Sequence, residues 1–491
     1  MIGISFNKKE FEYDAYTLVK AFYPKEDIEM YYTEEIQEEK SYDKLISILY
    51  GEKVVIRLCF EGKVREGEQA FDEAEDRKIR KNKLKQVLYQ LLAEETGHTL
   101  PWGNLTGIRP TKIAMGLIES GMSNAEAAEY MRKTYYTSNE KTALSITIAN
   151  REREILKNID YENGYSLYVG IPFCPSICLY CSFSSSPLER WRDKVDSYLD
   201  ALLKELDFIA DMMKDKTLDT IYIGGGTPTT LEPQQLHRLL GHIQKRFPVE
   251  QVKEYTIEAG RPDSITREKL QAIREYPVTR ISVNPQTMNA ETLKIIGRNH
   301  TVEDTRHAFA LARECGFDNI NMDLIVGLPG EHKDDVEHTL KEIQALDPDS
   351  LTIHSLAVKR AARLRMFKDQ YEEMGFENNQ EIMEMAMNYA RSCQMGPYYL
   401  YRQKNMCGNL ENVGYAKVDK AGIYNILIME EKQTILACGA GAGTKIVLPE
   451  KMTLENGKST NLIRIENVKN ITEYISRIDE MIERKGEWLW H

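Results

Sequence analysis

The sequence predicts an α/β protein, a partial (β/α)6 barrel with an N-terminal α+β domain and a C-terminal α+β extension. Six strand-like runs alternate with helical stretches through the middle of the chain. The runs are almost continuously apolar, as parallel strands covered on both faces are. Cysteines and unusual polar residues follow their carboxyl ends, where such folds carry their chemistry. The runs are expected at residues 165–171, 218–223, 252–257, 280–283, 319–326 and 350–356.

Residues 1–160 are expected to form a separate α+β accessory domain. A strand is predicted at 53–60, followed by a helix in which leucines recur at helical spacing. Gly97 is placed to end that helix, because glycine is common just past helix ends. A capping box from Ser123 to Glu126 predicts the start of another helix.

The predicted barrel occupies residues 161–366, and the C-terminal extension occupies residues 367–491. Within the extension, strand-like segments are expected at 423–429 and 434–437. The second segment ends at the glycine-rich loop 439–443, for which the sequence indicates no definite role.

Composition narrows the class of protein. The 491 residues suffice for two or three domains, and 42% hydrophobic content is typical of a globular protein. The first residues lack the apolar core of a signal peptide, and no stretch approaches the length of a membrane span, so a cytoplasmic location is expected. The net charge of -12 argues against nucleic acid as a partner. Eight cysteines in so long a chain do not form a disulfide framework.

Three of those cysteines lie in one short loop directly after the first barrel strand. Cys174 and Cys178 are separated by three residues, and Cys178 and Cys181 by two. Thiolates at this spacing can hold a [4Fe-4S] cluster, which normally has four protein sulfurs. Three local cysteines therefore leave one iron open to another ligand or take a fourth thiolate from elsewhere. Zinc is the alternative, but no second Cys or His pair follows at zinc-ribbon spacing.

A glycine-rich turn, residues 224–227, ends the second expected strand. Such a turn permits close backbone approach and offers main-chain N–H groups to a polar ligand. Alone it is often only structural. Beside the cysteine loop it becomes more specific, because an open iron needs an amine or carboxylate chelate, and S-adenosylmethionine carries both groups.

Together, the cysteine loop and the glycine turn resemble the radical S-adenosylmethionine (SAM) superfamily. Residues 165–445 are similar to the oxygen-independent coproporphyrinogen III oxidase family, HemN/HemW-like, and residues 103–112 with 402–415 resemble its HemZ branch. The resemblance implies a barrel of the radical SAM type. It also implies a [4Fe-4S] cluster on the three loop cysteines and two SAM molecules bound side by side.

The family motifs assign residues to both SAM molecules. Tyr168, Gly225 and Glu258 would hold the first, beside the cluster, and Tyr168 would join the three cysteines in catalysis. Purely structural roles are the alternative: a carboxylate at a strand end can cap a helix, and Arg298 could form a surface ion pair. The second SAM would be held by Tyr180, Gly226, Thr227, Gln286, Arg298, Asp323 and Ala357.

The family reaction is the oxidative decarboxylation of two propionates of coproporphyrinogen III to the vinyl groups of protoporphyrinogen IX, in anaerobic haem biosynthesis. A low-potential donor such as flavodoxin or ferredoxin would reduce the cluster. Because the tetrapyrrole is a tetracarboxylate and the chain is acidic, local cations are required. Our hypothesis is that some of the basic residues after the sixth run pair with propionates; a solvated basic turn is the alternative. These residues are Lys359, Arg360, Arg363 and Arg365.

Two residues depart from the oxidase pattern. Gly170 stands where characterised oxidases have His, and Phe183 where they have a fourth Cys. Phe183 is instead typical of the related haem-chaperone branch of the HemW type. Three functions therefore stay open: the decarboxylating oxidase, a haem-binding chaperone without turnover, and a radical SAM methyltransferase or haem-modifying enzyme.

Overall fold

The computed structural model describes residues 1–33, 42–107, 109–181, 185–357, 374–402, 410–454 and 459–489. The chain divides into two compact units. Unit 1 comprises Met1–Asn150 with Arg402–Lys404, and unit 2 comprises Arg151–Tyr401 with Asn405–His491. The division of the chain after residues 160 and 366, expected from the sequence, stays a prediction.

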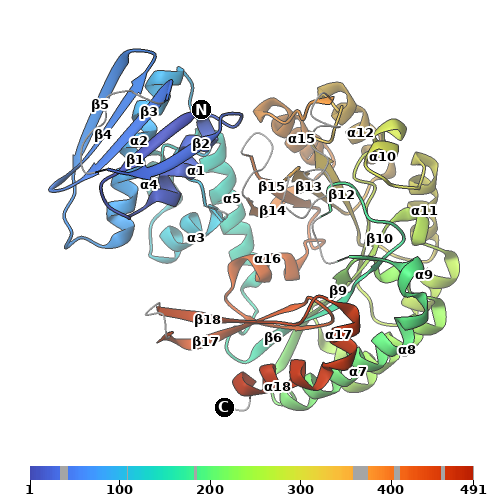
Figure 1. Ribbon diagram of the computed structural model, residues 1–491. Coiled ribbons are helices and arrows are strands. Elements are labelled where there is room, and N and C mark those ends of the chain that lie inside the picture. The colour runs from blue at the N-terminus through green and yellow to red at the C-terminus, as the bar shows by residue number, and fades with distance from the viewer. Residues whose placement is uncertain are drawn as a thin grey trace. The chain divides into compact units, whose positions relative to one another are not determined.

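Unit 1 contains a five-stranded sheet with two helices packed on it (Figure 1). Its elements are β1 (Ile2–Phe6), α1 (Glu12–Phe22), β2 (Ile28–Tyr32), β3 (Lys44–Tyr50), β4 (Lys53–Phe60), β5 (Lys63–Ala70) and α2 (Arg77–Thr96). The strand order is β2-β1-β3-β4-β5, parallel around β1 and antiparallel from β3 to β5. The apolar faces of α1 and α2 form one core with the sheet. The predicted strand 53–60 is confirmed.

Three further helices follow, α3 (Thr111–Glu119), α4 (Asn124–Tyr135) and α5 (Asn139–Leu156). Both helix signals read from the sequence are confirmed. Gly97 caps α2 with φ of 68°, a left-handed conformation that glycine adopts without strain. Ser123 and Glu126 form the reciprocal capping box that opens α4.

Unit 2 contains the partial barrel. Its six parallel strands are β6 (Gly164–Ile171), β9 (Thr217–Gly225), β10 (Glu254–Gly260), β11 (Arg280–Val283), β12 (Ile320–Val326) and β13 (Ser350–Ser355). They are neighbours in that order, each parallel to the next, as predicted. Within the described ranges they belong to one open sheet of eleven strands.

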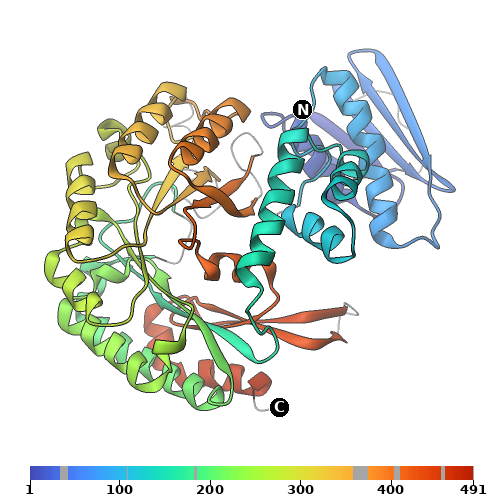
Figure 2. The ribbon, with the colours of Figure 1, turned by 180° about the vertical axis from the view of Figure 1, so that it is seen from behind.

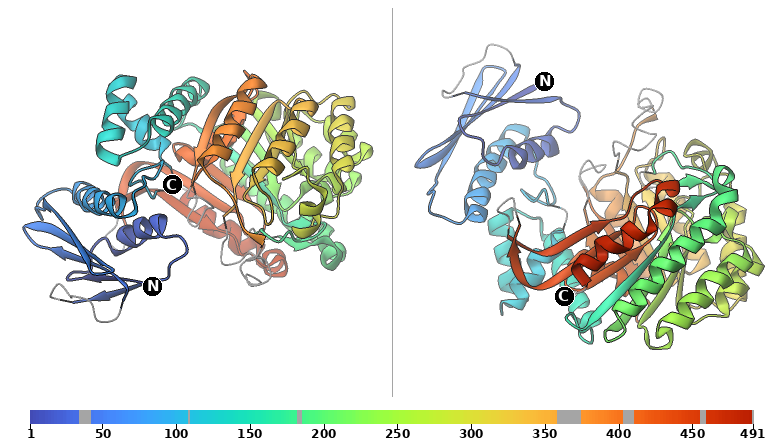
Figure 3. Two further views of the ribbon diagram at one scale, coloured as in Figure 1. Left: turned by 90° about the horizontal axis from the view of Figure 1, so that it is seen from above. Right: turned by 60° about the horizontal axis from the view of Figure 1, so that its bottom comes forward.

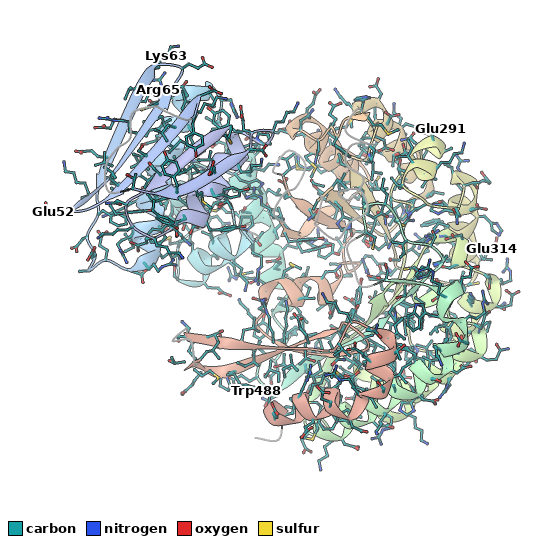
Figure 4. The ribbon with its side chains drawn as sticks, viewed as in Figure 1. Glu52, Lys63, Arg65, Glu291, Glu314 and Trp488 are labelled. Carbon is teal, nitrogen blue, oxygen red and sulfur yellow. The ribbon has the colours of Figure 1, made fainter. Side chains whose placement is uncertain are left out.

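Helices cover the outer face of this sheet, one after another around its curve (Figures 1 and 2). They are α7 (Val195–Met212), α8 (Pro233–Arg246), α9 (Arg267–Arg274), α10 (Ala290–Ile295), α11 (Val302–Glu314) and α12 (Lys333–Leu346), with the short α6 (Leu188–Trp191) before them. Their solvent side carries exposed ion pairs, such as Glu291 with Lys294 and Glu314 with Arg267 (Figure 4). The opposite face of the sheet is called the inner face below.

The C-terminal extension completes both sides of the sheet. Its elements are α15 (Gln380–Ser392), β14 (Gly396–Tyr401), β15 (Asn412–Ala416), α16 (Ile423–Glu430), β16 (Thr434–Cys438), β17 (Gly443–Thr453), β18 (Ser459–Glu466), α17 (Ile471–Ser476) and α18 (Ile478–Leu489). β15 and β14 extend the sheet from β13, antiparallel. β16 lies parallel to β6 on the other side and leads into the β17–β18 hairpin. Figure 3 shows α17 and α18 beside α7.

The expected strand at 423–429 is wrong, because this run forms the helix α16. An apolar run of this length fits a strand or a buried helix by pattern alone. Here the Glu254 carboxylate accepts hydrogen bonds from the backbone N–H groups of Ile423 and Tyr424, which satisfies two donors of the first helical turn. Stacking of Tyr424 on Tyr222 of β9 then holds α16 against the inner face.

No helix within the described ranges is both long enough and apolar enough to span a bilayer.

Candidate active site

The cysteine loop leaves the carboxyl end of β6 and is pinned by a small parallel pair, β7 (Phe173–Cys174) with β8 (Ser186–Pro187). Cys174 and Cys178 are buried, Cys181 is partly buried, and all three are free thiols. The Thr227 hydroxyl lies 3.6 Å from Cys174 Sγ. The loop therefore presents three thiols at the carboxyl edge of the sheet, beside the glycine turn.

Arg261, directly after β10, braces this loop. Its Nη1 donates hydrogen bonds to Ser176 O at 3.0 Å and Ser176 Oγ at 2.7 Å, and lies 3.9 Å from Cys178 Sγ. Asp263 holds the other side of the guanidinium at 2.6 Å. A nearby cation favours a thiolate. Sequence reasoning missed Arg261, although a basic residue at a strand end was a signal for it.

The three thiols fit a cluster better than a single metal ion. Burial raises the pKa of the Cys174 thiol to about 11, so its iron-binding thiolate form needs a cation beside it. Among the residues that the structure describes, no three His, Cys, Asp or Glu side chains converge on one metal position. Because each iron of a [4Fe-4S] cluster takes its own thiolate, the cysteines need not converge on one point.

Two glycines of the turn make room for the cysteine loop. A Cβ on Gly226 would lie 2.6 Å from Phe173 O and 2.9 Å from Cys174 Sγ. Gly225 has φ of 114°, and its Cβ would lie 2.9 Å from Ile171 O. Both contacts are shorter than real side chains tolerate, so glycine at 226 is needed for cysteine placement and glycine at 225 for close packing on the end of β6.

The residues expected around the first SAM lie on neighbouring strands. Tyr168 of β6 and Glu258 of β10 are partly buried, and Tyr222 of β9 lies between them. The Tyr168 and Tyr222 rings stack with centroids 6.2 Å apart, and the Tyr222 hydroxyl donates a hydrogen bond to Glu258 Oε1. Burial raises the pKa of Glu258 to about 7. Tyr222 was not found from the sequence.

Residues expected around the second SAM include a buried arginine. Arg298 is 7% exposed, donates from Nη1 to Asn284 O at 2.5 Å, and donates from Nη2 to the Tyr180 hydroxyl at 3.2 Å. It is therefore not a surface ion pair. Arg298 therefore links Tyr180, in the cysteine loop, to Asn284 at the end of β11.

Gln286 has an unusual backbone. Its φ of 71° is rare outside glycine, and its N–H and C=O bond to Asp323 O and to the Ile325 N–H of β12. Its side-chain Oε1 is buried without a partner among the described residues. Strained backbone and an unsatisfied buried atom are features that concentrate at ligand sites.

Asp323 lies in a polar group on the inner face. Asn321 donates a hydrogen bond to Asp323 Oδ1 at 2.7 Å, and His354 Nε2 lies 3.8 Å from Oδ2. On its other side, His354 Nδ1 is 3.3 Å from the Tyr401 hydroxyl. Burial alone would raise the pKa of Asp323, but His354, Asn321 and the charge of Arg280 hold it below its ordinary value.

The other predicted positions are distributed as follows. Ala357 is partly buried just beyond β13. Gly170 lies in β6, where its carbonyl accepts a hydrogen bond from Tyr198 at 2.6 Å. Phe183 and the four basic residues Lys359, Arg360, Arg363 and Arg365 lie outside the described residues.

A parallel open barrel with a three-cysteine loop and a glycine turn at one edge defines a radical SAM protein. Residues 168–343 match the family model of the Radical SAM superfamily. The structure of the Escherichia coli coproporphyrinogen III oxidase HemN shares this fold, with a TM-score of 0.51 and 24% identity over 65% of this chain and 70% of that one. Membership of the superfamily implies a [4Fe-4S] cluster and SAM.

Similarity to individual proteins identifies the family within the superfamily. The oxygen-independent coproporphyrinogen-III oxidase-like protein HemZ of Bacillus subtilis is 41% identical over 413 residues, 83% of this chain and 81% of that protein. The heme chaperone HemW of Bacillus subtilis is 38% identical over 195 residues, 40% of this chain and 51% of that one. The Escherichia coli oxygen-independent coproporphyrinogen III oxidase is 35% identical over 40% of this chain and 42% of that one. The chain belongs to the HemN/HemW-like family, in its HemZ branch.

Proposed function

We propose that this protein catalyses the oxidative decarboxylation of coproporphyrinogen III to protoporphyrinogen IX in anaerobic haem biosynthesis. The observation that carries the proposal is the gathering of Tyr168, Glu258 and Asp323 on the inner face of the sheet, on strands of which the first, β6, leads into the cysteine loop. The name and the extent of the HemZ match support the same reaction.

Cys174, Cys178 and Cys181 would hold the cluster, leaving one iron for SAM. When bound, the cluster and SAM supply a 5′-deoxyadenosyl radical. Thr227 donates toward Cys174 Sγ, and this contact and the charge of Arg261 both favour the thiolate form of Cys174. Arg261 also lies 3.9 Å from Cys178 Sγ.

The first SAM would bind to Tyr168, Gly225 and Glu258. A carboxylate suits the hydroxyl and amine donors of this ligand, and the tyrosine ring offers an apolar surface. The open backbone at Gly225, which is exposed, lets a ligand approach the end of β9 closely.

A second SAM would bind beside the first, at Tyr180, Gly226, Thr227, Gln286, Arg298, Asp323 and Ala357. Arg298 is held at two points, so it can meet a carboxylate without reordering. Gln286 offers its unsatisfied Oε1 to a donor, and Asp323, whose pKa is lowered, offers a carboxylate at neutral pH.

The experiment is an anaerobic incubation of reconstituted protein with coproporphyrinogen III, SAM, a low-potential donor (flavodoxin or ferredoxin) and a one-electron acceptor, which takes the electron that the substrate radical releases with carbon dioxide. We expect 5′-deoxyadenosine, carbon dioxide and protoporphyrinogen IX to form. Cys178→Ala should abolish all three products, whereas Cys315→Ala, a partly buried thiol outside the loop, should not. Absence of carbon dioxide with intact cluster and SAM would overturn the proposal.

A haem-carrying function is the second candidate, because 195 residues of the chain are 38% identical to the heme chaperone HemW of Bacillus subtilis, and Phe183 is typical of that branch. It predicts haem binding at one molecule per chain and no conversion of coproporphyrinogen III. Haem titration of the same reconstituted protein distinguishes it from the decarboxylase.

A further inference from the structure

We propose that Tyr222 is a positioning residue, which fixes the Glu258 carboxylate and the Tyr168 ring for the first SAM. This inference rests on the proposed function, in which Tyr168 and Glu258 hold that ligand. Tyr222 belongs to no family motif that the sequence presented. Its role follows from where β9 places it.

Two neighbouring rings, which also contact each other, pack against the Tyr222 ring. In the sheet register it lies directly beside Tyr168, and the two rings are 15° from parallel with centroids 6.2 Å apart. On α16, the Tyr424 ring stacks on Tyr222 at 4.5 Å and 22°. Tyr424 is itself 4% exposed. A ring packed against two neighbours has a restricted orientation for its hydroxyl, so the hydrogen bond that it makes is directional.

That hydroxyl points at Glu258 across the strand pair. It donates to Oε1, which leaves Oε2 of the carboxylate available to a ligand. The Glu258 side chain is partly buried rather than enclosed, so the free oxygen can be reached from the inner face. Tyr222 thus joins two ligand-facing residues that do not contact one another through any hydrogen bond described in the structure.

The charge state of Glu258 depends on this contact. Burial, the largest effect, raises the pKa of Glu258, and Asp323 of β12 raises it further. The hydrogen bond from Tyr222 opposes burial, as do Arg280 of β11 and His354 of β13. With its pKa raised to about 7, the charge of Glu258 changes near neutral pH, and loss of the Tyr222 hydrogen bond would raise that pKa further.

Gly224, the first glycine of the turn, gives independent support for the pairing of Tyr222 with Glu258. A Cβ on Gly224 would lie 2.9 Å from Tyr222 Cε1 and 3.1 Å from Glu258 Cδ. Any side chain there would displace one member of the pair. Gly225 makes room for the backbone of Ile171 and Gly226 for the cysteine loop, whereas Gly224 makes room for the Tyr222–Glu258 pair.

Tyr222→Phe tests the inference, because it keeps the stacked ring and removes only the donor. SAM binding to the reconstituted full-length protein is measured by equilibrium dialysis from pH 6 to pH 9. SAM binding weakens at low pH as Glu258 is protonated, and this decrease is called the acid limb of the binding curve. Loss of a charge-assisted hydrogen bond should shift the acid limb to higher pH by about one unit. Affinity should then fall about fivefold at pH 7 and stay nearly unchanged at pH 9. General damage to the fold would instead weaken binding at every pH.

Two further variants separate the possible failures. Tyr255→Phe removes a buried hydroxyl from β10 that has no partner among the described residues, so its binding curve should match the parent protein. Glu258→Gln should weaken binding and abolish the acid limb. If it does so while Tyr222→Phe leaves the curve unmoved, the role of Tyr222 is overturned. If Glu258→Gln binds normally, the proposed SAM site itself fails.

Discussion

The pKa values of two carboxylates on the inner face are shifted in opposite directions from their ordinary values. Burial raises the pKa of Glu258 to about 7, whereas His354 and Asn321 hold the pKa of Asp323 low. Neighbouring acids with separated pKa values can hold different protonation states at one pH. Near neutrality, Asp323 is therefore a fixed anion and Glu258 is a group whose charge a ligand can set.

Glu258→Gln should stabilise the SAM-free protein at alkaline pH. The folded state has a Glu258 pKa above that of the unfolded chain, so protonation favours folding, and stability falls as pH rises from about 4.5 through 7. The variant should gain about 3 kcal/mol at pH 8 and less than about 0.5 kcal/mol at pH 4.5. Urea unfolding at both pH values measures this. An equal gain at both would show that charge is not the cause.

Gly226→Ala should remove the cluster without unfolding the chain. Its new Cβ would meet Cys174 Sγ at 2.9 Å and the Phe173 carbonyl at 2.6 Å, so the loop must shift. Iron content after reconstitution should fall to less than about half of the parent value, because clusters need placed thiolates. Gly443→Ala is the matched control, since its nearest neighbour would be 4.0 Å away. Full iron loading of Gly226→Ala would contradict the expectation.

Among the elements, the C-terminal helices support the strand that leads into the cysteine loop. Lys485 of α18 and Glu205 of α7 form a fully buried ion pair at 2.6 Å. Glu205 also accepts hydrogen bonds from the Tyr474 hydroxyl at 2.5 Å and from the Gly439 N–H at 2.9 Å. Gly439 in turn packs on Gly170 of β6, where its Cβ would lie 2.5 Å from the carbonyl oxygen. The glycine-rich loop 439–443 is thus a packing element behind β6.

Lys485→Met should destabilise unit 2 by about 3–5 kcal/mol, because it leaves the Glu205 charge buried without its cation. The double variant Lys485→Met with Glu205→Leu should recover much of the loss, since no charge then stays buried. Arg267→Ala, which breaks an exposed pair with Glu314, should cost less than about 1 kcal/mol. Denaturant unfolding of the three variants makes the comparison. Equal losses in the single and double variants would refute the ion-pair explanation.

For the whole molecule, charge is the constraint on substrate binding. A chain of net charge -12 must meet a tetracarboxylate with a local concentration of cations. The basic segment after β13 is the candidate that the sequence offers, and it lies outside the described residues. Its part in binding therefore stays a hypothesis about this protein.

Arg363→Ala should lower the affinity for coproporphyrinogen III about tenfold, since a guanidinium can pair with a propionate through two hydrogen bonds. Arg246→Ala is the control, because Arg246 is engaged by Asp207 and Asp211 on the outer helices. The affinity is measured by anaerobic fluorescence titration with the oxidised porphyrin that corresponds to coproporphyrinogen III, used as an analogue of the substrate. Unchanged binding in Arg363→Ala would remove this residue from the substrate site.

Features fixed by neighbouring residues could be predicted from the sequence. The six barrel strands follow from apolar runs, and the cysteine loop follows from two short spacings. Both are properties of a few consecutive residues, as is the α4 capping box. The run at 423–429 was misjudged because its helix begins on the Glu254 carboxylate, a partner 169 residues away.

The sequence by itself determined the superfamily and the order of the strands, since local spacing and periodicity carry that information, and it predicts Cys174, Cys178 and Cys181 as the cluster ligands. Only the tertiary structure decided which side chains support the site. Tyr222 and Glu258 are 36 residues apart, His354 and Tyr401 are 47 apart, and Glu205 and Lys485 are 280 apart. Such pairs meet because neighbouring strands and packed helices bring them together, and no periodicity along the chain records that contact.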